Sequence, residues 1–361
     1  MTMNTPLLKW LATLPLLACA ACGGSEPPAV ASPANPPAEA SSVQAPAGGA
    51  GTSAAPDLAM PTTPTGASDD VVKGMRALEN NDLPSAKAYF DHALRAHPKD
   101  ADALYYQGVV AEKMGDKDTA EKSYKAALKV KPDLEQAAVN LSAFYTDALR
   151  YDDALAVSQA GLAKHADNGS LHLNAAVAYA GKGDQPSATK EFDAALRVTP
   201  NEPMFHLTYG HWLGSWKLVD PALAQLRAAR PLAKKNGDTA VGVLAAIGHE
   251  LHLLRAWSDC VPTYDEAIAL KDAAELRTER AACKIGAKDT AGALVDLQAA
   301  VANDASYAPA HYYLAGELAR VGQLKDAVAQ LQIFLKLEPN GSIAKAAQEK
   351  LRILKQKAGG N

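Results

Sequence analysis

A repeat with a period of about 34 residues runs through most of this 361-residue chain. The stretch GDKDTAEKSYKAALKVKP at 115–132 is repeated in outline two periods later by GDQPSATKEFDAALRVTP at 183–200. A period of this length is typical of repeat proteins, in which each unit buries its apolar side only against its neighbours. The period constrains the fold more than any other feature, because the units have to be copies of one structural element.

Each period has the pattern of two helices joined by a turn. The positions that mark it in the second and fourth units are Leu104, Gln107, Gly108, Ala111, Ala120, Tyr124, Ala127 and Pro132, and His172, Ala175, Ala176, Tyr179, Ala188, Phe192, Ala195 and Pro200. Apolar residues between them recur at i, i+3, i+4 and i+7, which predicts amphipathic helices. Gly115 and Gly183 predict the turn, since glycine tolerates a left-handed backbone. Pro132 and Pro200 predict the end of the second helix, because proline cannot continue it.

The register changes in the second half of the chain. It slips by four residues at GDTA, after residue 236, and resumes with Gly248 and Tyr264. Residues 272–306 are a poorer copy, in which Glu279 and Arg280 stand where we expect small residues.

A clear last unit, HYYLAGELARVGQLKDAVAQLQIFLKLEP, follows this poorer copy. The remaining residues, 342–361, are apolar on one side only and begin with Ser342, a residue favoured as a helix N-cap. They predict a helix that caps the exposed end of the stack.

This pattern resembles the tetratricopeptide repeat, a helix–turn–helix unit with the same period. The resemblance implies an all-α fold, a right-handed superhelical solenoid of about eight helical hairpins plus a C-terminal capping helix. The solenoid would span residues 69–341 and the cap and tail 342–361. It also implies one concave groove, lined mainly by the first helix of each unit, in which a partner binds.

The first residues, MTMNTPLLKWLATLPLLACAACGG, predict an export signal, because their apolar run is too short to span a bilayer. LLAC, which ends at Cys19, resembles a bacterial lipobox, in which the cysteine becomes the lipidated first residue. Cys22 is the alternative anchor, and a secreted protein with two incidental cysteines is the other interpretation. We therefore expect a signal peptide over residues 1–18. Residues 19–68 are then the anchor followed by a Pro/Ala/Ser/Gly-rich disordered tether.

Charge and motifs exclude several classes of function. The 36 Lys and Arg residues nearly balance the 40 Asp and Glu residues and form no basic stripe, so we expect no nucleic-acid partner. The chain has no glycine-rich phosphate loop, no HExxH and no GxSxG, and its charges follow helix exteriors at i, i+4. We expect a protein that is not an enzyme, with no cofactor and no small-molecule substrate.

Candidate binding residues follow from placing the resemblance on this register. The groove and peptide-binding candidates are Tyr105, Asn140, Asn174, Thr208, His211, His249, His252 and Tyr312. Asn140 and Asn174 are equivalent positions one unit apart, and their amides can pair with the backbone of an extended peptide. The alternative is that both are ordinary polar surface residues.

Two further groups could carry chemistry. His211, His249 and His252 fall on inner faces of neighbouring units, but a metal site would need a third ligand at bonding distance and supporting contacts, so we expect no metal. Cys260 lies near the start of a second helix and Cys283 near the end of the next first helix, so the two thiols can meet. They form a disulfide in an oxidising compartment, or they are both buried small apolar residues.

Signal and repeat together resemble bacterial outer-membrane tetratricopeptide lipoproteins, a class that serves pilus, secretion and cell-wall assembly. The resemblance implies a scaffold anchored in the outer membrane through its lipid and facing the periplasm, which binds protein partners of an envelope assembly. The alternatives are an accessory subunit of a polysaccharide synthesis or secretion machine, whose groove contacts glycan, and an accessory of a hydrolytic enzyme.

Overall fold

The structure is a computed structural model that describes residues 68–235 and 237–359. The expected signal peptide, both candidate anchors (Cys19 and Cys22) and nearly all of the expected tether lie outside these residues. The described residues form α-helices and one short 3₁₀ helix, η1. Their bounds are α2 (Asp69–Glu79), α3 (Leu83–Ala96), α4 (Ala101–Lys113), α5 (Lys117–Val130), α6 (Glu135–Asp147), α7 (Tyr151–Leu162), α8 (Gly169–Gly181), α9 (Gln185–Val198), α10 (Pro203–Ser215), α11 (Val219–Ala233), η1 (Gly237–Thr239), α12 (Ala240–Leu253), α13 (Trp257–Leu270), α14 (Ala274–Gly286), α15 (Thr290–Asn303), α16 (Ala308–Arg320), α17 (Leu324–Leu337) and α18 (Ala344–Gly359).

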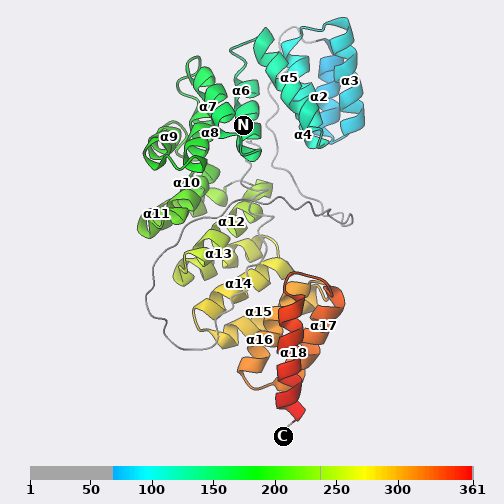
Figure 1. The fold of residues 1–361 in the computed structure, drawn as a ribbon, viewed down its shortest axis with the longest axis vertical. Helices are drawn as coiled ribbons and strands as arrows, with labels where there is room; N and C mark the ends of the chain where they lie inside the picture. The colour runs from blue at the N-terminus through cyan, green and yellow to red at the C-terminus, as the bar shows by residue number, and fades with distance from the viewer. Residues whose placement is uncertain (1–67, 236, 360–361) are drawn as a thin grey trace, which may run out of the picture.

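Helices α2 to α17 pack as eight consecutive antiparallel pairs, and α18 packs against α17. The second helix of each pair also contacts the first helix of the next pair. The stack therefore grows by neighbour contacts alone, and its first and last helices lie at opposite ends of the molecule (Figure 1). The prediction of an all-α solenoid of eight hairpins with a capping helix is confirmed.

Each hairpin turns at one residue with a left-handed backbone. These residues are Asn81, Gly115, Leu149, Gly183, Lys217, Arg255, Lys288 and Gly322, with φ between 56° and 83°. Most steps between them equal the period of the sequence repeat; the step from Lys217 to Arg255 is longer because it contains η1. The left-handed turns predicted at Gly115 and Gly183 are present, and five other units make the same turn without glycine.

The two helices of a unit approach closely where the first helix has a glycine. A Cβ built on Gly108 would lie 2.7 Å from the ring of Tyr124, which is completely buried. Gly74 meets Phe90 and Gly248 meets Tyr264 in the same way. The recurring glycine thus provides the space that the aromatic residue of the second helix fills.

Replacing Gly108 with alanine is expected to lower the free energy of unfolding by roughly 1–2 kcal/mol, because the new methyl group overpacks the core. Overpacking a core costs about 1–3 kcal/mol, and the better helix propensity of alanine offsets up to about 1 kcal/mol of that. Gly316→Ala in α16 is the matched control, because its Cβ would meet only the end of Lys350, at 3.3 Å. The control should be neutral or stabilising in urea unfolding. Equal effects of the two substitutions would contradict this account of the packing.

Residues 272–306, the poorer copy of the repeat, contain the hairpin of α14 and α15. Near its C-terminal end α14 buries the small residues Ala281, Ala282 and Cys283, and Glu279 and Arg280 lie just before them. The interval from Arg255 to Lys288 is one residue shorter than the usual period, which displaces the pattern. The unit is a regular hairpin, in which Arg280 contacts Asp296 and Asp265.

First helices of neighbouring units contact one another on one side of the stack. The pairs α2–α4, α6–α8, α10–α12, α12–α14 and α14–α16 pack directly in addition to the contacts within each hairpin. Second helices of neighbouring units do not pack this closely in the described part of the chain. The first helices therefore form the crowded, concave side of a curved stack, which we call the inner face.

Candidate functional site

Hydrogen bonds between first helices link consecutive units along the inner face. The Asn140 amide of α6 donates to the hydroxyl of Tyr105 on α4, at 3.2 Å. The Asn174 amide of α8 donates to the Val139 carbonyl at 2.9 Å and to the Ser142 hydroxyl at 2.8 Å, both on α6. The two equivalent asparagines are thus already bonded inside the protein, to the unit before their own.

Three of the expected groove residues are not exposed. Tyr105 is 9% exposed, Asn174 3% and Thr208 0%, so the expectation that these side chains line an open surface is wrong. Thr208 instead donates its hydroxyl proton to the Met204 carbonyl one turn earlier. Burial raises the pKa of Tyr105 to about 12, so its hydroxyl stays protonated at neutral pH. These three side chains are packed beneath the surface of the inner face.

The other expected groove residues are half-buried and reach the surface. They are Asn140, His211, His249, His252 and Tyr312. The ring of Tyr312 lies 5.3 Å from that of Phe334, and the amine of Lys350 lies 5.1 Å from the Tyr312 ring. Because Lys350 belongs to α18, the capping helix covers part of the inner face of the last hairpin.

The histidines of the middle units have different surroundings. Nδ1 of His211 lies 2.9 Å from a carboxylate oxygen of Glu250, which links α10 to α12. Burial lowers the pKa of His249 and of His252, so both are neutral at neutral pH. Nε2 of His249 is buried and has no hydrogen-bond partner among the described residues. The structure does not assemble the three histidines as one set of metal ligands.

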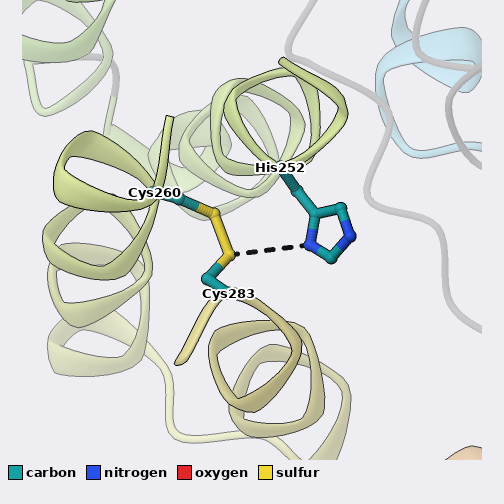
Figure 2. A group of neighbouring side chains, drawn as sticks. All are labelled: His252, Cys260 and Cys283. Atoms are coloured by element: carbon teal, nitrogen blue, oxygen red, sulfur yellow. Dashed lines mark hydrogen bonds between the residues drawn. A yellow bond between two sulfur atoms is a disulfide. The ribbon is translucent and has the colours of Figure 1, made fainter. Parts of the chain in front are cut away.

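Cys260 and Cys283 are brought together at the junction of the sixth and seventh hairpins. Both side chains are fully buried, their Cα atoms are 6.1 Å apart, and the sulfur atoms are joined. Nδ1 of His252 lies 3.8 Å from Sγ of Cys283 (Figure 2). The three side chains come from α12, α13 and α14, so two units meet at this cluster.

The inner face carries almost no formal charge. Three equivalent positions on each first helix from α4 to α16 are occupied by Tyr105, Tyr106 and Val109; Val139, Asn140 and Ala143; Leu173, Asn174 and Val177; Leu207, Thr208 and His211; Ala245, Ala246 and His249; Thr278, Glu279 and Ala282; and Tyr312, Tyr313 and Gly316. All of them are buried or half-buried; Glu279 is the one carboxylate among them, His211 and His249 are the two histidines, and none is Lys or Arg. Burial raises the pKa of this carboxyl group to about 7. These positions therefore present mainly apolar and uncharged polar side chains.

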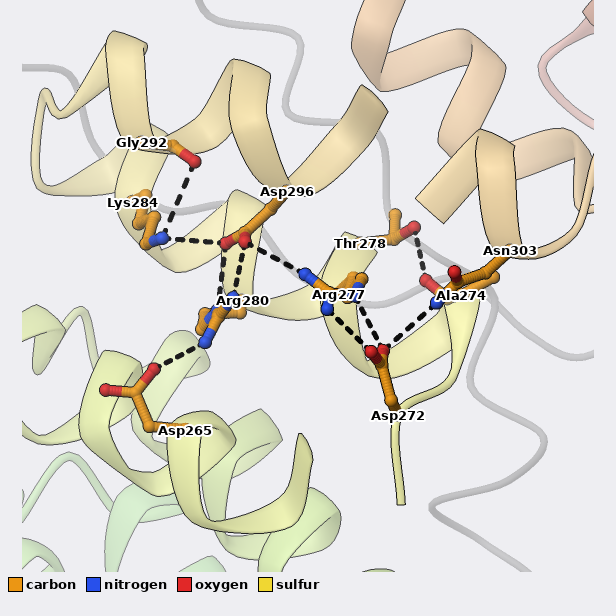
Figure 3. Close-up of polar contacts among 10 residues, drawn as sticks. All are labelled: Asp265, Asp272, Ala274, Arg277, Thr278, Arg280, Lys284, Gly292, Asp296 and Asn303. Carbon is orange, nitrogen blue, oxygen red and sulfur yellow. Dashed lines mark hydrogen bonds and ion pairs between the residues drawn. The ribbon is translucent and has the colours of Figure 1, made fainter. Parts of the chain in front are cut away.

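A buried network of charges lies between α14 and α15 and was missed at the sequence level. The Asp296 carboxylate, 1% exposed on its side chain, accepts two hydrogen bonds from Arg280 at 2.5 and 2.9 Å. Lys284 lies 2.8 Å from the same carboxylate, and Arg277 lies 3.9 Å from it (Figure 3). Arg280 also donates to Asp265 of α13, at 2.7 Å. The network ties three helices and two units together.

The sequence does contain an indication of this network, but the residues that give it are not among those that define the repeat. Arg277, Arg280 and Lys284 are spaced three and four residues apart, which places them on one face of α14. A helix that carries three cations on a packed face requires a buried anion opposite. The residues next to Asp296 in the sequence do not mark it as the buried anion.

A protein-family model described as "Tetratricopeptide repeat" matches residues 71–136 and 145–203. These ranges contain most of the first four hairpins. No curated protein matches the chain in sequence.

Solved structures of helical repeat proteins resemble the chain. Yeast Tom70 is 14% identical with a TM-score of 0.53, and the match covers 84% of this chain and 67% of Tom70. The thermophilic protein TTC0263 of Thermus thermophilus is 23% identical (TM-score 0.43; 50% of this chain, 97% of that one). PilF of Pseudomonas aeruginosa is 17% identical (TM-score 0.46; 56% and 90%). At these identities the likeness concerns the fold alone.

None of the described helices combines the length and the apolarity needed to span a bilayer.

Proposed function

We propose that this chain, a tetratricopeptide repeat protein, is an envelope scaffold that holds an uncharged protein segment along its inner face. Tetratricopeptide repeats are protein-interaction modules, which is the coarse function of this fold. The observation that carries the finer proposal is the low charge at the equivalent positions of seven first helices, where Glu279 is the one carboxylate, no Lys or Arg occurs and two residues are histidines.

The half-buried residues of the inner face are the ones that would contact the segment. Ala143 and Val177 supply apolar surface on α6 and α8, and Asn140 and His211 supply polar atoms beside them. An extended chain or an amphipathic helix recognised in this way gains affinity from apolar contact and orientation from a few polar groups. The buried Asn174 helps to fix the spacing of α6 and α8 through its hydrogen bond to the Val139 carbonyl.

The membrane attachment in this proposal rests on the sequence. A lipid on Cys19, or on Cys22, would anchor the chain in the outer membrane, and the tether would carry the solenoid into the periplasm. The partner would then belong to a pilus, secretion or cell-wall assembly. The low charge of the inner face fits a protein segment in such an assembly, because it provides neither a basic nor an acidic patch.

Site-specific photocrosslinking in intact cells tests the proposal. A photoreactive phenylalanine analogue at Ala143 or Val177 should give crosslinks to a protein partner that are recovered with the membrane fraction. The same analogue at Tyr89 or Val295, which are exposed on second helices, should give none. The chain with both Cys19→Ser and Cys22→Ser should leave the membrane fraction. Equal crosslinking from the inner and outer positions would overturn the placement of the partner, and unchanged fractionation would overturn the anchor.

A further inference from the structure

A cluster of three metal-ligating side chains lies where the sixth and seventh hairpins meet. The ligand atoms of His252, Cys260 and Cys283 all lie within 4.8 Å of one another, and theirs is the one group of this kind that the described residues contain. Each side chain comes from a different helix, namely α12, α13 and α14 (Figure 2). Both cysteines are fully buried and His252 is half-buried. The packing of the three helices therefore already holds these side chains close together.

The spacing of His252 and Cys283 matches a tetrahedral zinc site, and the two sulfur atoms would reach such a spacing once their bond is reduced. With Zn–S near 2.3 Å and Zn–N near 2.0–2.1 Å, a nitrogen and a sulfur ligand lie about 3.6 Å apart. Nδ1 of His252 and Sγ of Cys283 are 3.8 Å apart. Two thiolates on the same ion would lie about 3.8 Å apart. The two cysteine Cα atoms, at 6.1 Å, allow either a sulfur–sulfur bond or that larger separation after rotation about the Cα–Cβ bonds.

The charge of the cluster favours a divalent cation such as Zn²⁺. Two thiolates and one Zn²⁺ sum to zero, so the filled site would bury no net charge, whereas a monovalent ion would leave one negative charge in a dry junction. Three protein ligands leave the fourth tetrahedral position for water.

We propose that His252, Cys260 and Cys283 bind one Zn²⁺ when the two cysteines are reduced, and that the disulfide and the zinc site exclude each other. A dithiol reductant donates two electrons and two protons to the disulfide, giving two thiols and the oxidised reductant. Binding of Zn²⁺ then displaces the two thiol protons and forms two Zn–S bonds. Either state joins α13 to α14. The two hairpins are linked through the cysteine sulfur atoms by a disulfide in one state and by the zinc ion in the other.

The test is zinc binding by the full-length protein in a Cys19→Ser, Cys22→Ser background, which removes the two other thiols of the chain. After reduction and anaerobic desalting, titration with Zn²⁺ against a chromophoric chelator should give one ion per chain with release of protons. The same protein after oxidation to the disulfide should bind none. Co²⁺ in place of Zn²⁺ should give the thiolate charge-transfer absorption of a tetrahedral site.

Three variants separate the ligands from their surroundings. Cys283→Ser and His252→Gln should weaken zinc binding by at least about 100-fold, which is more than the loss of an outer partner usually costs. His249→Gln, one turn away on α12, should bind zinc like the parent protein. Circular dichroism verifies that each variant keeps its helices. No binding by the reduced parent, equal binding by the oxidised form, or a loss with His249→Gln but not with His252→Gln would overturn the assignment.

Discussion

Replacing Asp296 with asparagine is expected to lower the free energy of unfolding by about 3 kcal/mol, because it breaks a buried ion pair. Removing one partner of such a pair costs roughly 3–5 kcal/mol, since the opposite charge is left in the interior. Here the loss should lie at the low end of that range. Arg280 keeps its contact with Asp265 and Arg277 keeps Asp272, and both cationic side chains retain some exposure, 15% and 20%. The asparagine is of similar size, so the change isolates the charge.

The matched control for this prediction is Asp152→Asn. Asp152 of α7 pairs with Lys182, the residue that follows α8, and its side chain is 87% exposed. An exposed pair is screened by water and contributes little to stability. Urea unfolding should therefore separate the two substitutions clearly.

The location of the effect is as informative as its size. Long repeat arrays can lose two-state cooperativity, so hydrogen exchange should accompany the unfolding curves. Asp296→Asn should raise exchange in α13, α14 and α15 and leave α4 to α7 unchanged. Unfolding midpoints that coincide for the two variants, or a uniform rise in exchange along the chain, would contradict a structural role for the buried network.

The helices and their pairing could be predicted because the repeat encodes them locally. A glycine such as Gly108 and an aromatic residue such as Tyr124 stand at fixed positions in one unit, and their contact forms within that unit. The turn at Gly115 likewise depends on a single residue with φ of 80°. Because each unit packs only on its neighbours, a pattern read over a single period contains most of what the fold requires.

The roles of polar residues could not be predicted in the same way. The sequence places Asn174 on the inner face but does not show that the Val139 carbonyl and the Ser142 hydroxyl lie opposite its amide. That contact depends on how far one unit is shifted against the next. A residue assigned to partner binding by its position was therefore found to bind its own chain.

The buried charges also could not be predicted from the repeat, as a comparison of equivalent positions in two units shows. In the second unit, Gln107 accepts from Ser123 and donates to Asp91 of the unit before, both at 2.8 Å. In the seventh unit, Arg280 and Asp296 occupy the places of Gln107 and Ser123 and make the same connections with charge. The repeat fixes which positions meet, but the residue types that meet there vary. A pattern of small and aromatic residues therefore predicts which positions come into contact. It does not predict whether that contact is a neutral hydrogen bond or an ion pair.

Glu279 makes the stability of the chain depend on pH. Burial raises the pKa of its carboxyl group from the ordinary 4.5 to about 7, and no hydrogen bond or ion pair from the described residues compensates. Tyr264 of α13 and Tyr307 before α16 also have raised pKa values, first through burial and then through the charge of Glu279. Both phenols therefore stay neutral at and below neutral pH and do not contribute in the acidic range.

The direction of this pH dependence follows from the number of protons that the folded and the unfolded chain bind. Between about pH 4.5 and 7 the folded chain keeps the Glu279 proton and the unfolded chain has lost it, so the folded state binds more protons. Its stability then falls as the pH rises, by up to about 1.4 kcal/mol per pH unit, or about 3 kcal/mol over the whole window. Above pH 7 both states are ionised and the loss is complete.

Glu279→Gln should remove this loss, because the amide is neutral at every pH. The variant should gain about 3 kcal/mol over the parent chain between pH 4 and pH 8, measured as the difference between their urea unfolding free energies at each pH. Histidines that titrate in the same range affect both proteins equally and cancel in that difference. Glu275→Gln, an exposed change on the same helix, should follow the parent profile. A difference between Glu279→Gln and the parent that stays constant with pH would mean that this carboxyl group is solvated in the folded chain, and the inner face would then carry a full negative charge at neutral pH.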